Sequence, residues 1–181
     1  MKKIVVLNGS PRVNGNTAAL IAEFKRGAEE TGNEVTVFYL HGMNIHGCVG
    51  CCCGGKDINS PCTQKDDMEL IYPKYNEADV VVIASPLYFW NFSGQLRTAF
   101  DRLFAVSEHY PHYRGPQKDA ALIMAAEGYG FSDCENYYEH LLEHLDWNNI
   151  GKVLCGGVLK PGDIAGKIEL RKAYELGLSI K

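Results

Sequence analysis

The sequence contains no long hydrophobic run, no stripe of basic residues and no large excess of either charge. Its longest apolar stretch, residues 120–126, has seven residues, whereas a helix that crosses a membrane needs about 20. The formal net charge is −4, and no Lys- or Arg-rich segment provides the electrostatic footprint that nucleic-acid binding requires. We therefore expect no membrane partner and no nucleic-acid partner.

The N-terminus also lacks the pattern of a secretory leader. Lys2 and Lys3 are followed by only four apolar residues, Ile4–Leu7, which is shorter than the hydrophobic region of a signal peptide. A chain of 181 residues is the size of one domain and buries about 70% of its unfolded surface. We expect a single domain spanning residues 1–181, located in the cytoplasm.

Two common nucleotide-binding motifs are absent as well. In a Walker A loop, four residues separate the glycines and a Lys follows the second glycine. Here five residues separate Gly9 from Gly15, and Asn16 stands where the Lys would be. The dinucleotide fingerprint G-x-G-x-x-G does not occur either. These absences argue against a nucleoside triphosphatase and against a dinucleotide-binding fold of the usual kind.

What the sequence does have is a donor-rich loop between a strand and a helix. The apolar run Ile4–Leu7 predicts a buried strand, and a helical pattern begins at Ala18. The free N–H groups and dipole of a helix N-terminus attract a phosphate. The loop between them adds short polar side chains and a guanidinium, from Ser10, Arg12, Asn16 and Thr17. We interpret residues 8–17 as a phosphate-binding loop, the alternative being a glycine-rich turn with a helix cap.

A second strand-to-helix loop is unusually aromatic. The strand predicted at residues 79–84 runs into Pro86, Leu87, Tyr88, Phe89, Trp90 and Asn91, and a helix capped by Ser93 follows. Loops are normally exposed and polar, so these rings indicate the wall of a site for a flat, amphipathic ring. They could instead cover the core or a subunit contact.

Strands and helices alternate along the rest of the chain. We predict further strands at residues 34–40, 120–125 and 153–155, and helices at residues 132–146 and, after a cap at Asp163, 164–176, where Gly177 ends the pattern. Such alternation requires a parallel sheet covered on both faces. Ligands of these sheets bind at the carboxyl ends of the strands, so the loop at Ser10, the loop at Tyr88 and the loop containing Glu127 and Gly128 should meet.

These motifs carry a resemblance to a known family. Gly9–Arg12 and Gly15–Thr17, together with residues 85–90 and 94–102, resemble the NAD(P)H-dependent FMN reductases, and in particular the branch called iron–sulfur flavoproteins. The resemblance implies a flavodoxin-like sheet of order 2-1-3-4-5, bound FMN, and a homodimer or homotetramer. By this resemblance, Ser10, Arg12, Asn16 and Thr17 would hold the FMN phosphate, and Pro86, Leu87, Tyr88, Phe89, Trp90 and Asn91 would lie along its isoalloxazine ring. We also expect cofactor contacts from Asn14 and Gly15 of the first loop and from Glu127 and Gly128 of the third strand-end loop, where Glu127 could instead be a solvated loop charge.

The chain has seven cysteines, and five of them lie within residues 48–62. Clustered cysteines in a cytoplasmic protein indicate a metal or redox site rather than disulfides. The iron–sulfur branch implies C-x2-C-x2-C and a later cysteine, which Cys48, Cys51 and Cys62 match, but the third position is Gly54 and Cys53 comes one residue early. The cysteine-rich loop, residues 46–64, could hold a [4Fe–4S] cluster or zinc through Cys48, Cys51, Cys53 and Cys62, or carry free thiols. We favour the last.

We expect an FMN-dependent NAD(P)H oxidoreductase that reduces a small acceptor such as a quinone or a flavin by hydride transfer. Because the flavin carries the chemistry, the sequence identifies no catalytic side chain. Two alternatives remain open: an iron–sulfur flavoprotein that acts in electron transfer with FMN and a cluster, and a non-catalytic flavin or metal sensor.

Overall fold

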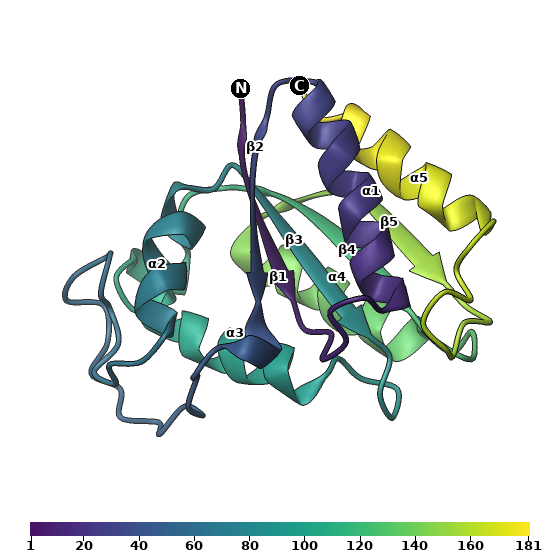
Figure 1. The fold of residues 1–181 in the computed structure, drawn as a ribbon. Helices are drawn as coiled ribbons and strands as arrows, with labels where there is room; N and C mark the ends of the chain where they lie inside the picture. Colours follow the sequence, from purple (N-terminus) through teal and green to yellow (C-terminus); the bar gives the residue numbers. More distant parts are fainter.

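The computed structural model describes residues 1–181 as a five-stranded sheet with helices on both faces (Figure 1). Every strand pair is parallel, and the order β2-β1-β3-β4-β5 confirms the predicted flavodoxin-like topology. The strands are β1 (Lys3–Asn8), β2 (Glu34–Tyr39), β3 (Val80–Pro86), β4 (Asp119–Ala125) and β5 (Asn148–Cys155). The helices are α1 (Asn16–Glu30), α2 (Met68–Glu77), α3 (Gly94–Ser107), α4 (Ser132–Leu145) and α5 (Ile168–Leu178), with short 3-10 turns η1 (Leu40–Gly42) and η2 (Pro111–Tyr113).

The pleat of the strands divides the apolar residues between two cores. Successive side chains of a strand point to opposite faces, so Val5 and Leu7 of β1 enter one core while Ile4 and Val6 enter the other. The first core lies under α2, α3 and α4, and the second lies under α1 and α5. Both chain ends lie at the end of the molecule opposite the loops that follow the strands (Figure 1). No helix is long and apolar enough to cross a membrane.

Helices α1 and α5 cross with almost no space between their backbones. A β-carbon built on Gly177 would lie 2.1 Å from the carbonyl oxygen of Phe24, and one built on Gly27 would lie 2.2 Å from that of Tyr174. The prediction that Gly177 ends the last helix was therefore wrong. Gly177 lies inside α5, where the absence of a side chain permits the close approach to α1.

The predicted start of the last helix was also wrong. Helix α5 begins at Ile168, and residues 161–166 form turns. The Asp163 carboxylate does not cap the helix but accepts the N–H groups of Leu159 and Lys160, at 2.9 and 2.7 Å. These two bonds lower the pKa of Asp163 and satisfy the carboxylate within its own turn. The strand before it, β5, begins at Asn148 rather than at Val153.

Helix α2 was not predicted, and its sequence explains why. Pro73 lies inside it, where a proline removes a helical hydrogen bond. The helix nevertheless buries Met68, Ile71, Tyr72 and Tyr75 against the sheet. Tertiary packing of an apolar face supplies most of the stability of a protein helix, and here it outweighs the proline.

Candidate functional site

The loop after β1 is fixed by contacts with the loop after β3. The N–H of Gly9 donates to the carbonyl of Ala84 at 2.8 Å, and the Ser93 hydroxyl donates to the carbonyl of Gly9 at 2.7 Å. A β-carbon on Gly9 would lie 2.5 Å from that hydroxyl oxygen and 2.7 Å from the β-carbon of Leu96. Only glycine permits this approach, so the two loops meet as the sequence predicted. The hydroxyl of Ser93 also accepts from Leu96 N–H, confirming the predicted cap of α3.

Helix α1 follows the loop after β1, and its N-terminus lies beside that loop. Helix α1 begins at Asn16, directly after the extended N-cap residue Gly15, and its first N–H groups have no partner within the helix. Ser10 and Thr17 are buried polar residues beside it. Ser10 is held by its own N–H, which donates to the Asn8 side chain at 2.9 Å. These residues form the donor-rich end of the site.

The aromatic loop after β3 makes a tight reversal. Tyr88 and Asn91 exchange backbone hydrogen bonds of 2.9 and 3.0 Å, and the two residues between them adopt left-handed conformations, with φ of 47° for Phe89 and 57° for Trp90. This reversal turns both rings outward, leaving Phe89 95% exposed. Leu87 faces the site instead, and its N–H is bound to the carbonyl of Ala125 at 3.1 Å.

The loop after β5 contacts the donor-rich end of the site. Arg12 Nη1 donates to the carbonyl of Leu159 at 2.6 Å, and Asn16 Nδ2 donates to that of Lys160 at 3.0 Å. The other amide atom of Asn16, Oδ1, is buried and has no hydrogen-bond partner. An unpartnered buried acceptor is costly, so this atom indicates a ligand group that donates to it.

These loops enclose a cavity of about 200 Å³ at the carboxyl ends of the strands. Nine of its lining residues were predicted: Ser10, Arg12, Gly15, Asn16, Thr17, Pro86, Leu87, Tyr88 and Glu127. Ala126 belongs to the third strand-end loop, which was expected to complete the site, and three residues were missed: Ala125, Val158 and Leu159. The sequence carried a signal for the last two, because they follow a strand whose carboxyl end lies beside the others.

Five residues expected at the site do not line the cavity. They are Asn14, Phe89, Trp90, Asn91 and Gly128, all of them exposed. Three of them, Phe89, Trp90 and Asn91, lie in the aromatic loop. The reversal between Tyr88 and Asn91 turns their side chains away from the cavity. Trp90 instead packs towards the loop after β4, where a β-carbon on Gly130 would lie 3.2 Å from its Nε1.

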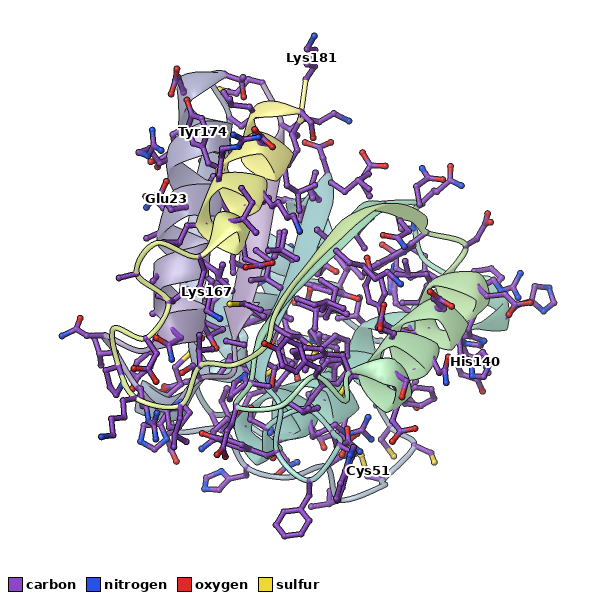
Figure 2. The ribbon with its side chains drawn as sticks, turned by 90° about the vertical axis from the view of Figure 1, so that its right-hand side faces the viewer. Glu23, Cys51, His140, Lys167, Tyr174 and Lys181 are labelled. Carbon is purple, nitrogen blue, oxygen red and sulfur yellow. The ribbon has the colours of Figure 1, made fainter.

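The cysteine-rich loop, residues 46–64, lies apart from α1 and α5. Cys51 stands at the opposite end of the molecule from Lys181 (Figure 2). Four of the loop's cysteines are exposed, namely Cys48, Cys51, Cys52 and Cys53, and Cys62 is half-buried. A hydrogen bond with the Thr63 hydroxyl lowers the pKa of Cys51. Cys134 and Cys155 are buried, and burial raises the pKa of both thiols.

Comparison with known proteins agrees with this geometry. The family model for NADPH-dependent FMN reductase matches residues 2–158. An iron-sulfur flavoprotein from Archaeoglobus fulgidus is 30% identical over 180 residues, which cover 99% of this chain and 79% of that protein. Another, from Methanosarcina thermophila, is 34% identical over 101 residues, 55% of this chain and about half (51%) of the relative.

The fold has solved counterparts as well. An NAD(P)H:quinone oxidoreductase from Methanothermobacter marburgensis superposes with a TM-score of 0.77 over 99% of both chains, at 19% identity. That likeness concerns the fold. The match of the family model over residues 2–158 concerns the sequence, and by it the chain belongs to the NADPH-dependent FMN reductase family.

Proposed function

We propose that this protein holds FMN in the cavity at the carboxyl ends of the strands and transfers electrons from NAD(P)H to a small acceptor such as a quinone or a flavin. One observation carries the proposal. A helix N-terminus with phosphate-binding side chains and an apolar wall suited to a flat ring line the same cavity. FMN has both of these parts, a phosphate and a flat ring.

The donor-rich end would hold the phosphate. The N-terminus of α1 and the hydroxyls of Ser10 and Thr17 suit a dianion. Arg12, from the same loop after β1, lines the same cavity. Arg12 and Asn16 now bind the carbonyls of Leu159 and Lys160. Both side chains carry N–H groups beyond those bonds, so they can serve the loop after β5 and a ligand together.

The other end would hold the ring. Pro86, Leu87, Ala126 and Val158 give it an apolar lining, and the bond from Leu87 N–H to Ala125 fixes the wall through its backbone. Oδ1 of Asn16 is buried without a partner, and a hydroxyl of the ribityl chain would be able to donate to it.

Bound FMN would supply the exchange of electrons between the nicotinamide and the acceptor. The protein would bind the cofactor, orient it and exclude water from part of it. No side chain of the cavity needs to act as an acid or a base, and Glu127 is the only carboxylate in the lining.

Titration of the cofactor-free protein with FMN and riboflavin tests the phosphate site. We expect FMN to bind far more tightly, and equal affinities would contradict the proposal. Steady-state oxidation of NADH and NADPH, with a naphthoquinone or free FMN as acceptor, tests the reaction. Tight FMN binding without turnover with either nucleotide would favour a sensor or a carrier of electrons from another source.

A further inference from the structure

The names of the relatives imply an iron–sulfur cluster, which requires thiolates that converge. In this structure three thiols of the cysteine-rich loop contact other groups of the loop itself. The Cys48 sulfur accepts from Gly50 N–H at 3.4 Å, the Cys51 sulfur lies 3.4 Å from the Thr63 hydroxyl, and the Cys53 thiol donates to the carbonyl of Cys51 at 3.0 Å. No three His, Cys, Asp or Glu side chains of the chain are grouped so that they could hold a metal ion.

The position that would carry the third cysteine is packed against α3. Gly54 N–H donates to Glu108 Oε2 at 3.0 Å. A β-carbon on Gly54 would lie 2.2 Å from that oxygen and 3.0 Å from the β-carbon of Ala105. A side chain therefore does not fit at residue 54 unless the loop leaves α3. The next residue continues the contact, with the carbonyl of Gly55 2.8 Å from His109 Nδ1.

A buried arginine of α3 holds both ends of the loop. Arg102 Nη1 donates to the carbonyl of His46 at 2.9 Å, and Nη2 donates to that of Gln64 at 3.2 Å. The same guanidinium pairs with the carboxylate of Asp66. Arg102 is 1% exposed, and its five N–H groups form a rigid fork. One side chain thus fixes two segments that lie 18 residues apart in the sequence.

Cys62, the last cysteine of the loop, lies near the same guanidinium. Nε of Arg102 is buried without a hydrogen-bond partner. Burial opposes the charge of the guanidinium, but Asp66 and then Cys62 outweigh it, so the pKa of Arg102 is raised. Cys62 is therefore held beside a protein cation, at the position where the family pattern has its fourth ligand.

We propose that α3, and not a metal, organises the cysteine-rich loop: Arg102 is the positioning residue for its two ends, Glu108 binds its middle, and its exposed cysteines are free thiols. The protein groups that fix this loop occupy the space at residue 54 and bind the backbone on both sides of it. The proposal concerns this loop and stands independently of the function proposed for the cavity.

Iron analysis and hydrogen exchange of the full chain test the proposal. After anaerobic purification, we expect far less than one iron and one sulfide per chain. We also expect protected amides at Gly54 and Gly55, unchanged by an iron and zinc chelator. About four irons and four sulfides per chain, or protection that the chelator abolishes, would overturn the proposal.

Substitutions in α3 test the role of its side chains. Arg102→Gln should speed amide exchange of residues 46–66 roughly tenfold or more, since local opening becomes easier, and should increase alkylation of Cys62. Arg102→Lys should restore only part of the protection, because an ammonium lacks the fork. The control Arg26→Gln, in an exposed pair with Glu23, should leave this loop unchanged.

A second variant keeps the test decisive if Arg102→Gln does not fold. Glu108→Ala, which removes the acceptor of the Gly54 N–H, should fold and should lose protection at Gly54 while the ends of the loop stay protected. Unchanged exchange in every folded variant would overturn the proposal, since α3 would then not organise the loop.

Discussion

Arg102 and Asp66 form an ion pair that solvent does not reach. Nη1 lies 2.5 Å from Oδ2, Nη2 lies 3.2 Å from Oδ1, and the two side chains are 0% and 1% exposed. Asp66 also accepts the N–H groups of His46 and Met68. This pair joins α3 to the segment that precedes α2. Removal of one of the two side chains would leave the charge of the other buried without a partner.

We therefore predict that Asp66→Asn destabilises the protein strongly. Removing one member of a buried pair costs about 3–5 kcal/mol, which urea unfolding at neutral pH can measure. Glu77→Gln is a matched control, because Glu77 and Lys3 form an exposed pair and exposed ion pairs contribute little to stability. Equal effects of the two substitutions would show that the buried pair is not important for stability.

The same pair predicts a pH dependence. Burial opposes ionisation of Asp66, but Arg102 and the two N–H groups outweigh it and hold the pKa of Asp66 below its ordinary value. A lowered pKa stabilises the folded state fully above the unfolded value, about 3.9, and this contribution is lost as the pH falls through the folded pKa. The difference in unfolding free energy between the wild type and Asp66→Asn should accordingly shrink only below about pH 4.

Gly177→Ala should destabilise the contact between α1 and α5. The added methyl group would lie 2.1 Å from the carbonyl oxygen of Phe24, and overpacking of this kind costs about 1–3 kcal/mol. Gly94→Ala is the matched control, because a β-carbon there meets nothing within 4 Å and alanine favours a helix. Thermal unfolding should show a lower midpoint for Gly177→Ala alone. A higher unfolding midpoint for Gly177→Ala would mean that α1 and α5 can move apart without a loss of stability.

Arg12→Ala should weaken the binding of FMN much more than the binding of riboflavin. Charge-assisted hydrogen bonds to a phosphate contribute about 1.5–3 kcal/mol, a loss of roughly 10- to 150-fold in affinity. Part of the loss would come from the loop after β5, because Arg12 also holds Leu159. Isothermal titration with both ligands separates the two effects, since riboflavin lacks the phosphate. Unchanged FMN affinity would show that Arg12 does not bind the phosphate.

A homodimer or larger assembly, with the aromatic residues of 88–92 and 109–113 near the contact, is a further prediction. Phe89 and Trp90 are 95% and 61% exposed, and Tyr113, which is 51% exposed, stacks on Phe104. Exposed apolar groups at such density mark partner surfaces. Phe89→Ser should weaken self-association in sedimentation experiments, whereas Leu70→Ser, at an exposed position of α2, should not. A stable wild-type monomer would contradict this prediction.

The strands, their order and the meeting of their loops could be predicted from the sequence. Short β-branched runs such as residues 80–83 can be recognised locally, because burial on both faces of a parallel sheet requires them. The alternation of strands and helices then leaves few topologies. The donors of residues 10–17 could be recognised for the same reason, since a helix N-terminus binds anions whatever surrounds it.

Other features could not be predicted from local sequence patterns. The direction of the aromatic loop follows from two left-handed residues, Phe89 and Trp90, which no local pattern favours because such conformations cost energy for residues with a β-carbon. The place of Gly177 inside α5 follows from its contact with Phe24. Pro73 lies in a helix only because that helix covers the sheet.

The sequence by itself thus determined the fold class, the family and the donor-rich end of the cavity, since these rest on local patterns. Only the tertiary structure decided how the cysteine-rich loop is held. Cysteine spacing describes which thiols could converge, but packing decides whether there is room for them. Here Gly54 lies against Glu108, and Arg102 reaches His46 and Gln64 from another helix. These contacts join segments that the chain brings together only when α3 packs on the sheet.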